Sequence, residues 1–155
     1  MSLDPVTGGG AVERIRQLHE SMLEMDHVAS RILSIEVSEP PAQPGNRNIV
    51  LLPCWNRRWY LPAPKLLTMY RMVQEADVVH LMNHWTILNA LIYLMARLAG
   101  RPYFICPAGA LPVFGRSQKI KYWYNRLVGR RIVRNSAAAI AISENEIGCL
   151  LQHSV

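Results

Sequence analysis

Cysteine is scarce in this chain, and its spacing excludes the scaffolds that depend on it. The three cysteines, Cys54, Cys106 and Cys149, are far apart, and no C-x-x-C pair occurs. An odd and dispersed set of thiols argues against a disulfide framework and against a structural zinc site. The sequence therefore indicates a protein of a reducing compartment.

Long apolar runs and several familiar motifs are missing as well. The longest apolar stretch, Trp85–Gly100, is shorter than the ~20 residues that cross a bilayer, and Asn89 and Arg97 interrupt it. The first ten residues do not resemble a signal peptide. No G-x-x-x-x-G-K-[S/T], G-x-S-x-G or H-E-x-x-H pattern occurs. We therefore expect no cofactor, and a cytoplasmic location that is either soluble or peripheral at the inner face of the membrane.

Acidic residues are outnumbered by basic ones, and the imbalance is local. Lys and Arg together number 17 against 11 Asp and Glu, which gives a formal charge of +6. Residues 116–134 contain no acid and seven basic residues, namely Arg116, Lys119, Lys121, Arg126, Arg130, Arg131 and Arg134. Arginine forks suit phosphate and carboxylate, so the stretch favours an anionic partner. A solvated helix face is the alternative interpretation.

The apolar half of the composition is arranged in short runs that alternate with helical patterns. Period-3.6 patterns predict helices and continuous apolar runs predict buried strands. The predicted strands span residues 31–35, 49–53, 77–82, 102–106 and 137–142. The predicted helices span 11–25, 65–75, 85–99 and 116–134, with a last one from Ser143. This order predicts a doubly wound α/β fold, a mostly parallel sheet with helices on both faces, in a single Rossmann-like domain over residues 1–155.

A glycine run precedes the first predicted helix. Gly8, Gly9 and Gly10 are expected in a loop that exposes backbone N–H groups at a helix N-terminus, which is an anion site. The dinucleotide fingerprint is incomplete because Glu13 stands where its third glycine would be. A flexible turn is the alternative. Such a loop normally follows a strand, and too few residues precede Gly8, so we expect the first strand to be missing.

Two further loops follow predicted strands and are candidates for a cleft, because ligands bind outside the carboxyl ends of the strands in such sheets. The first is Asn83, His84 and Trp85, and the second is Pro107, Ala108, Gly109 and Ala110, whose small side chains let a ligand approach the backbone. His80 and His84 are four apart, but one lies in a strand and the other in a loop, so we expect no metal site. His80 is interpreted as a satisfied core histidine, and His84 as a weak catalytic candidate.

The predicted helix over 116–134 combines an apolar stripe with a basic one. Ile120, Trp123, Tyr124, Leu127 and Val128 follow helical spacing and are expected to face the core. Arg116 begins this basic surface, and Lys119, Arg126 and Arg130 lie on one flank, where they could contact anionic lipid. Arginine stems that only cover apolar surface are the alternative. No recognised nucleic-acid motif occurs, so nucleic acid is not expected as a partner. Ser143 and Glu146 form the S-x-x-E pattern of a capping box.

In their order, these motifs resemble the N-terminal, acceptor-side domain of family 4 glycosyltransferases, which have the two-domain GT-B fold. The resemblance is carried by Thr7–Glu13, Ala76–His80, Gly100–Tyr103, Cys106–Leu111, the basic helix and Ala137–Glu146, and it spans about Pro5 to Leu151.

This resemblance implies retaining transfer of a hexosyl group from a nucleotide-diphospho-sugar to a glycan or lipid-linked acceptor. It also implies that the acceptor is held by this domain, with the glycine loop near the donor phosphates. The nucleotide belongs to a C-terminal domain with an E-x7-E-like motif, which we expect to be absent here. The family's Pro-His-Gly loop, whose histidine contacts the donor sugar, reads Pro107-Ala108-Gly109 in this chain.

Three functional hypotheses follow. In the first, the chain is the N-terminal half of a glycosyltransferase and is inactive alone. In the second, it is a non-catalytic subunit of a split enzyme that binds the acceptor or a membrane. In the third, it is a basic α/β binding module.

Overall fold

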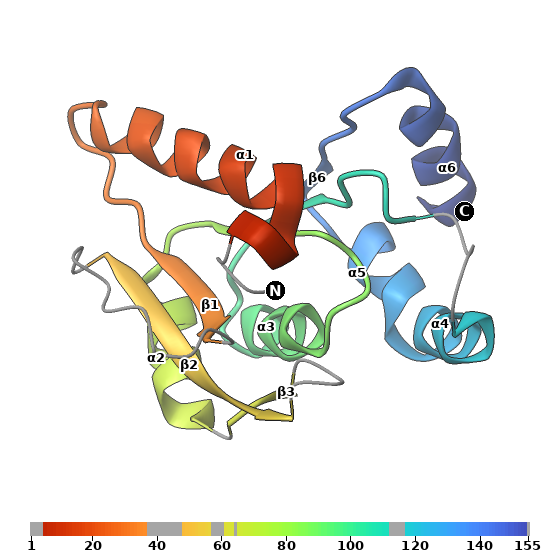
Figure 1. The fold of residues 1–155 in the computed structure, drawn as a ribbon, viewed down its shortest axis with the longest axis horizontal. Coiled ribbons are helices and arrows are strands. Elements are labelled where there is room, and N and C mark those ends of the chain that lie inside the picture. Colours follow the sequence, from red (N-terminus) through yellow and green to blue (C-terminus); the bar gives the residue numbers. More distant parts are fainter. Residues whose placement is uncertain (1–4, 37–47, 57–60, 64, 112–116, 155) are drawn as a thin grey trace. The chain divides into compact units, whose positions relative to one another are not determined.

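The chain divides into two compact units, residues 1–65 and 66–155, and each contains one three-stranded sheet. The computed structural model describes residues 5–36, 48–56, 61–63, 65–111 and 117–154. The first unit contains one helix besides its sheet, and in the second unit helices flank the sheet (Figure 1). Three of the four strand pairings are parallel, which confirms the prediction of an α/β fold with mostly parallel strands.

The first unit contains one helix and a mixed sheet. Its elements are α1 (Pro5–Leu23), β1 (Ile32–Glu36), β2 (Ile49–Asn56) and β3 (Leu61–Pro62). Strand β1 pairs in parallel with β2, and Ile32 lies opposite Ile49. The two predicted strands are confirmed, although β2 continues to Asn56 and pairs antiparallel with β3. The irregular connection expected from residue 54 onward therefore begins as a strand.

Helix α1 corrects the prediction for the glycine run. The helix begins at Pro5, so Gly8, Gly9 and Gly10 lie within it rather than in a loop before it. Proline suits the first helical turn because its missing N–H would have no helical partner there. Inside a helix, glycine N–H groups from the second turn onward bond to helix carbonyls. The prediction that the first strand is missing concerns mainly residues 1–4, which lie outside the described residues.

The second unit contains a fully parallel sheet. In chain order, its elements are α2 (Leu66–Glu75), β4 (Val79–Met82), α3 (Ile87–Leu98), β5 (Tyr103–Cys106), α4 (Gln118–Tyr124), the π-helical segment η1 (Asn125–Gly129), α5 (Arg130–Arg134), β6 (Ala138–Ala139) and α6 (Glu144–Ser154). Strand β5 lies between β4 and β6. The strands predicted in this region are present, but β6 is only two residues long. The helix expected over 116–134 begins at Gln118 and contains a π-helical segment.

The core of the second unit lies between its sheet and helices. Leu81, Tyr103 and Ile105 of the sheet are almost fully buried, as are Ile92 and Ala96 of α3. Helix α2 packs beside α3, and α5 packs beside α6 (Figure 1). Each buried leucine or isoleucine contributes roughly 1.5–3 kcal/mol relative to exposure. The continuous apolar runs of the sequence thus become strands covered by helices.

Helix α3 ends as its sequence predicts, at Gly100. This residue has a φ of +66°, and it follows the C-cap residue Ala99. The Arg101 N–H donates to the Ala96 carbonyl at 2.9 Å, and the Gly100 N–H donates to the Arg97 carbonyl at 3.4 Å. This pair of bonds is a Schellman motif, in which glycine takes the left-handed position without strain.

Within the part of the chain that the structure describes, no helix is both long and apolar enough to cross a membrane.

Two glycine substitutions test the boundaries of these helices. Gly10→Ala should raise the free energy of unfolding by about 0.5–1 kcal/mol, because alanine favours a helix interior and no other atom lies within 4 Å of the added Cβ. Gly100→Ala should lower it by about 1–2 kcal/mol, because a Cβ is disfavoured at positive φ. Urea denaturation measures both values. Destabilisation by Gly10→Ala would contradict the helical placement of the glycine run.

Candidate functional site

Three loops meet at one edge of the second unit's sheet, where the parallel strands β4, β5 and β6 all end. The Asn83 N–H donates to the Cys106 carbonyl at 2.8 Å and continues the β4–β5 ladder into the loops. The Trp85 indole N–H donates to the Ala110 carbonyl. The Gly109 N–H donates to the Glu146 carboxylate at 2.6 Å. Residues predicted for the cleft from two separate loops are therefore hydrogen-bonded neighbours.

The loop after β4 is held by amide side chains. Asn83 has a φ of 70°, a left-handed conformation that asparagine tolerates better than most residues. The Asn89 side chain donates to the carbonyls of Met82 and Asn83, each at 2.8 Å. Thr86 caps α3 by accepting the Asn89 N–H at 3.1 Å. Residues at the start of α3 thus hold the backbone at the point where the chain leaves β4.

The loop after β5 is a tight turn with two left-handed residues. Ala108 has a φ of 53° and Gly109 a φ of 81°, and the Ala110 N–H donates to the Pro107 carbonyl at 3.1 Å. Positive φ at both central positions is the pattern of a type I′ turn. For alanine this conformation costs roughly 1–2 kcal/mol. The surroundings of the turn must offset that cost.

His84 is fully buried behind these loops. Its Nε2 lies 2.9 Å from the Asn125 side-chain oxygen, which only accepts, so Nε2 carries the proton. Its Nδ1 is buried and has no hydrogen-bond partner among the described residues. Burial lowers the pKa of His84, and the charge of His153 lowers it further, whereas the bond to Asn125 raises it. The imidazole is therefore neutral at neutral pH.

Aromatic rings surround His84. The ring centroid of Trp85 lies 4.7 Å away and that of Tyr124 lies 5.7 Å away, both edge-to-face. The Tyr124 hydroxyl donates to the His84 carbonyl at 2.8 Å, and burial raises the pKa of that hydroxyl. The Lys121 ammonium lies 5.6 Å from the centre of the Trp85 ring. The loop after β4 is thus packed against the helix that contains residues 121 and 124.

The π-helical segment η1 places two residues against His84. Asn125 and Gly129 lie at its ends and are both buried. A Cβ at Gly129 would overlap the Asn125 side-chain oxygen and lie 3.0 Å from His84 Nε2. Only glycine leaves room for the bond between His84 and Asn125. Single π turns inside helices often occur at functional sites.

The expected apolar face of this helix is wrong for three of its five residues, whereas Tyr124 and Val128 are partly buried. Ile120, Trp123 and Leu127 are 50%, 57% and 64% exposed, whereas Asn125, Gly129, Ile132 and Val133 are buried. On a uniform α-helical wheel, the exposed residues 120, 123 and 127 already lie opposite the buried residues 125, 129, 132 and 133. The prediction failed because it assigned the aromatic and aliphatic side chains of the exposed face to the core. Of the predicted basic surface, Lys119, Arg126 and Arg130 are exposed, and Arg116 lies outside the described residues.

Two other predictions need correction. His80 is partly buried, with its pKa lowered by burial, but its Nε2 has no hydrogen-bond partner among the described residues, so it is not a satisfied core histidine. Glu146 does not complete the expected capping box with Ser143, because its second carboxylate oxygen accepts the Ile142 N–H at 2.9 Å.

Among the described residues, no group of three or more His, Cys, Asp or Glu is placed to hold a metal ion.

Sequence reasoning missed the residues that tie the loops together. Glu146, Tyr124 and Asn125 bond to residues 37 to 41 positions away along the chain. The only local signal was an asparagine and a glycine in a helix that is otherwise basic and apolar. The S-x-x-E pattern predicts only a helix cap for Glu146 and contains no sign of its bond to the loop after β5.

The buried neutral state of His84 makes stability depend on pH. A histidine whose pKa is lowered in the folded state binds a proton more readily in the unfolded state. Its contribution to the free energy of unfolding is therefore fully present above pH ~6.5 and is lost as the pH falls below that value. His84→Gln keeps an N–H donor for Asn125 but does not titrate, so the decline between pH 7.5 and 5 should become smaller. Urea denaturation at several pH values measures this change. The exposed His27→Gln serves as the control, and an equal effect of both variants would contradict the role of His84.

Comparison with known families agrees with the motifs and the fold. The sequence model of a family described as a glycosyl transferase 4-like domain matches residues 9–154, which confirms the resemblance. Searches of curated proteins and of solved structures gave no match. The matched range includes the parallel sheet, the loops after β4, β5 and β6, and the helix that contains η1. The chain belongs to the glycosyl transferase 4-like domain family.

Proposed function

We propose that the chain forms the acceptor side of a glycosyl-transfer site, in which a hexosyl group passes with retention from a nucleotide-diphospho-sugar to a glycan or lipid-linked acceptor. The observation that carries the proposal is the joining of three loops at the carboxyl ends of β4, β5 and β6 by hydrogen bonds. This edge is where open α/β sheets bind their ligands.

The residues of this edge suit a sugar ligand. The turn after β5 offers alanine and glycine, whose small side chains leave the backbone accessible, and Gly109 is exposed. Trp85 is partly exposed and supplies an aromatic surface beside Ala110. His84 is fully buried, so in this proposal it holds the loop and transfers no proton. The residue in the position of the family's donor-contacting histidine is Ala108.

The proposal also includes a donor-binding domain that residues 1–155 do not contain. The resemblance to two-domain glycosyltransferases supports this, because there the nucleotide is held by the second domain. By itself the chain should then bind acceptor-like sugars weakly and leave nucleotide-sugars intact.

Titration of the isotope-labelled chain tests the acceptor role. Octyl β-glucoside below its micelle concentration presents a sugar and an alkyl tail, and it should shift the backbone amide signals of residues 83–86 and 107–110. Ala110→Phe should abolish these shifts by filling the edge, whereas Ala137→Phe, at an exposed position, should not. UDP-, GDP- and ADP-glucose should remain unhydrolysed in the same samples. Hydrolysis by the chain alone, or shifts confined to other residues, would contradict the proposal.

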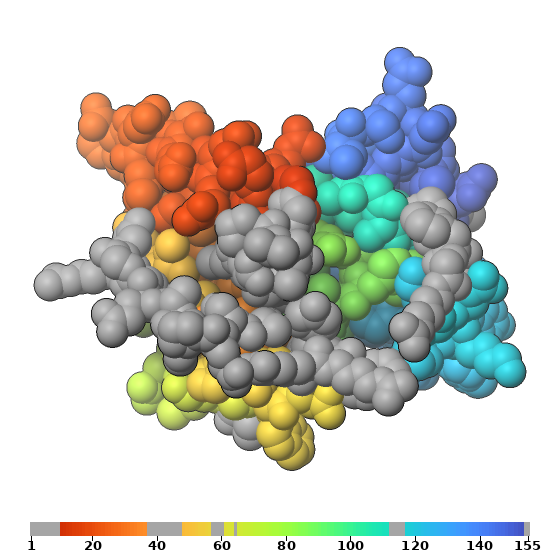
Figure 2. All heavy atoms as spheres, viewed as in Figure 1, coloured from red at the N-terminus to blue at the C-terminus, as the bar shows by residue number. Residues whose placement is uncertain are grey.

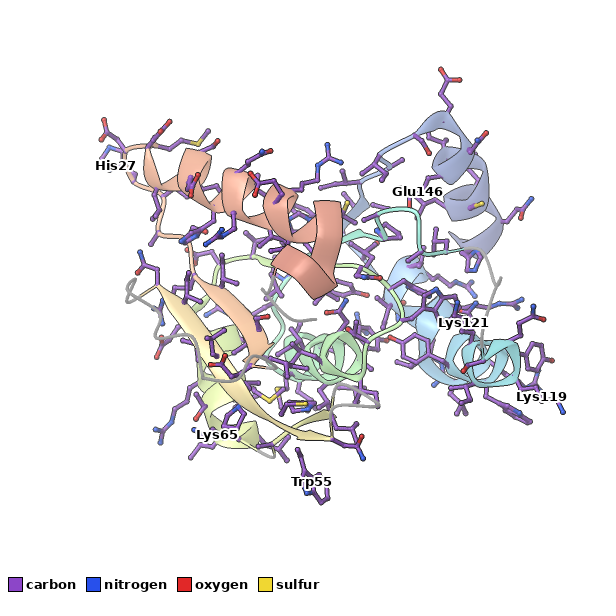
Figure 3. The ribbon with its side chains drawn as sticks, viewed as in Figure 1. His27, Trp55, Lys65, Lys119, Lys121 and Glu146 are labelled. Carbon is purple, nitrogen blue, oxygen red and sulfur yellow. The ribbon has the colours of Figure 1, made fainter. Side chains whose placement is uncertain are left out.

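We further propose that the surface of α4 and η1 contacts an anionic membrane. Ile120, Tyr122, Trp123 and Leu127 are all at least 50% exposed on this surface. Lys119, Arg126 and Arg130 are exposed nearby, and the sequence from 116 to 134 contains no acid. Figure 2 shows α4, in light blue, with much of its surface uncovered, and Figure 3 shows Lys119 and Lys121 on different sides of the helix. Exposed aromatic and aliphatic residues beside basic ones are the pattern of an interfacial helix.

Vesicle flotation tests the membrane contact. The chain should float with vesicles of phosphatidylglycerol and phosphatidylcholine at low salt, but not with phosphatidylcholine alone. Arg126→Glu with Arg130→Glu should reduce the bound fraction at least fivefold, since each basic residue near an anionic surface contributes about 1 kcal/mol. Trp123→Ser with Leu127→Ser should also reduce it at least fivefold, because these residues supply the apolar part of the interfacial helix. Matched controls are Trp55→Ser, at a residue 77% exposed, and Arg14→Glu with Arg16→Glu. Equal loss in the controls, or unchanged binding of both test variants, would refute the contact.

A further inference from the structure

The turn after β5 has an unfavourable backbone conformation at Ala108. Its φ of 53° is left-handed, and the neighbouring Gly109 has a φ of 81°. A glycine would adopt this conformation freely, but a residue with a Cβ does so only where its surroundings hold it. Two contacts from other elements reach this turn: the Trp85 indole on the Ala110 carbonyl, and the Glu146 carboxylate on the Gly109 N–H.

Glu146 makes hydrogen bonds that helix capping does not explain. Its side chain is 4% exposed, at the first turn of α6 (Figure 3). One oxygen accepts the Gly109 N–H at 2.6 Å, and the other accepts the Ile142 N–H at 2.9 Å. In a capping box, the glutamate side chain bonds back to the N-cap N–H while the N-cap side chain accepts the N–H of the glutamate. Here one carboxylate joins the loop after β5 to the loop after β6.

A carboxylate is well suited to accept hydrogen bonds from both loops. Hydrogen bonds from backbone N–H groups to a carboxylate are shorter and stronger than those to neutral oxygens. The carboxylate also lies near the N-terminus of α6, where the helix dipole favours negative charge. Both effects strengthen the two hydrogen bonds that the buried Glu146 carboxylate accepts.

We propose that Glu146 is a positioning residue of the glycosyl-transfer site, whose carboxylate holds the left-handed Ala108–Gly109 turn in the conformation that receives the sugar. This inference rests on the proposed acceptor function. Glu146 touches no substrate in this assignment, and it acts through the backbone of Gly109.

The test compares Glu146→Gln with Glu144→Gln, which removes the same charge from an exposed position in the same helical turn. In Glu146→Gln, the Gly109 and Ile142 amide signals should move upfield and their hydrogen exchange should accelerate. The dissociation constant for octyl β-glucoside should rise about tenfold, in line with the loss of one charged hydrogen bond. Glu144→Gln should change neither readout.

Rescue separates positioning from general destabilisation. Adding Ala108→Gly to Glu146→Gln should restore most of the affinity for octyl β-glucoside, because glycine adopts the left-handed turn without the carboxylate. Adding Ala29→Gly, at an exposed position elsewhere, should not. Unchanged Gly109 signals in Glu146→Gln, or no rescue by Ala108→Gly, would overturn the inference. Failure of the unmodified chain to bind octyl β-glucoside would instead refute the proposed function.

Discussion

Parallel pairing on both sides of β5 is the constraint on which the second unit depends. Because β4, β5 and β6 run in one direction, every connection must cross back over the sheet, and helices α3 and α4–α5 supply these crossings. The same constraint sends all three strand ends to one edge. The loops there become neighbours, although up to 60 residues separate them in the chain.

Most of the fold could be predicted from local patterns. The run at 49–53 is continuous and apolar, and 77–82 is mostly apolar apart from Asp77 and His80. Such runs are typical of strands covered on both faces. Gly100 ended α3 as expected because a left-handed residue is needed there and glycine provides it at little cost. The start of the first helix differs from the prediction, because three consecutive glycines have low helix propensity and resemble a loop, whereas α1 continues through them.

The site was only partly predictable, for a physical reason. The rule that ligands bind at the carboxyl ends of parallel strands identified the loops containing Trp85 and Gly109. It could not identify Glu146 or Asn125, because a hydrogen bond between distant segments leaves no periodic trace in the sequence. Membership in the glycosyl transferase 4-like family gives the chain a glycosyltransferase-type role.

The continuous helix formed by α4, η1 and α5 has one buried face and one exposed face, and the π-helical segment lies between its two α-helical parts. A π turn has one more residue than an α turn, so it acts as a phase shift within an otherwise continuous helix. Residues 125, 129, 132 and 133 are all buried, and the apolar residues at 120, 123 and 127 are all exposed. Shortening the segment by one residue would rotate α5 by ~100° relative to α4. The number of residues between Tyr124 and Arg130 therefore sets which side chains this helix presents to its own core and which it presents to solution.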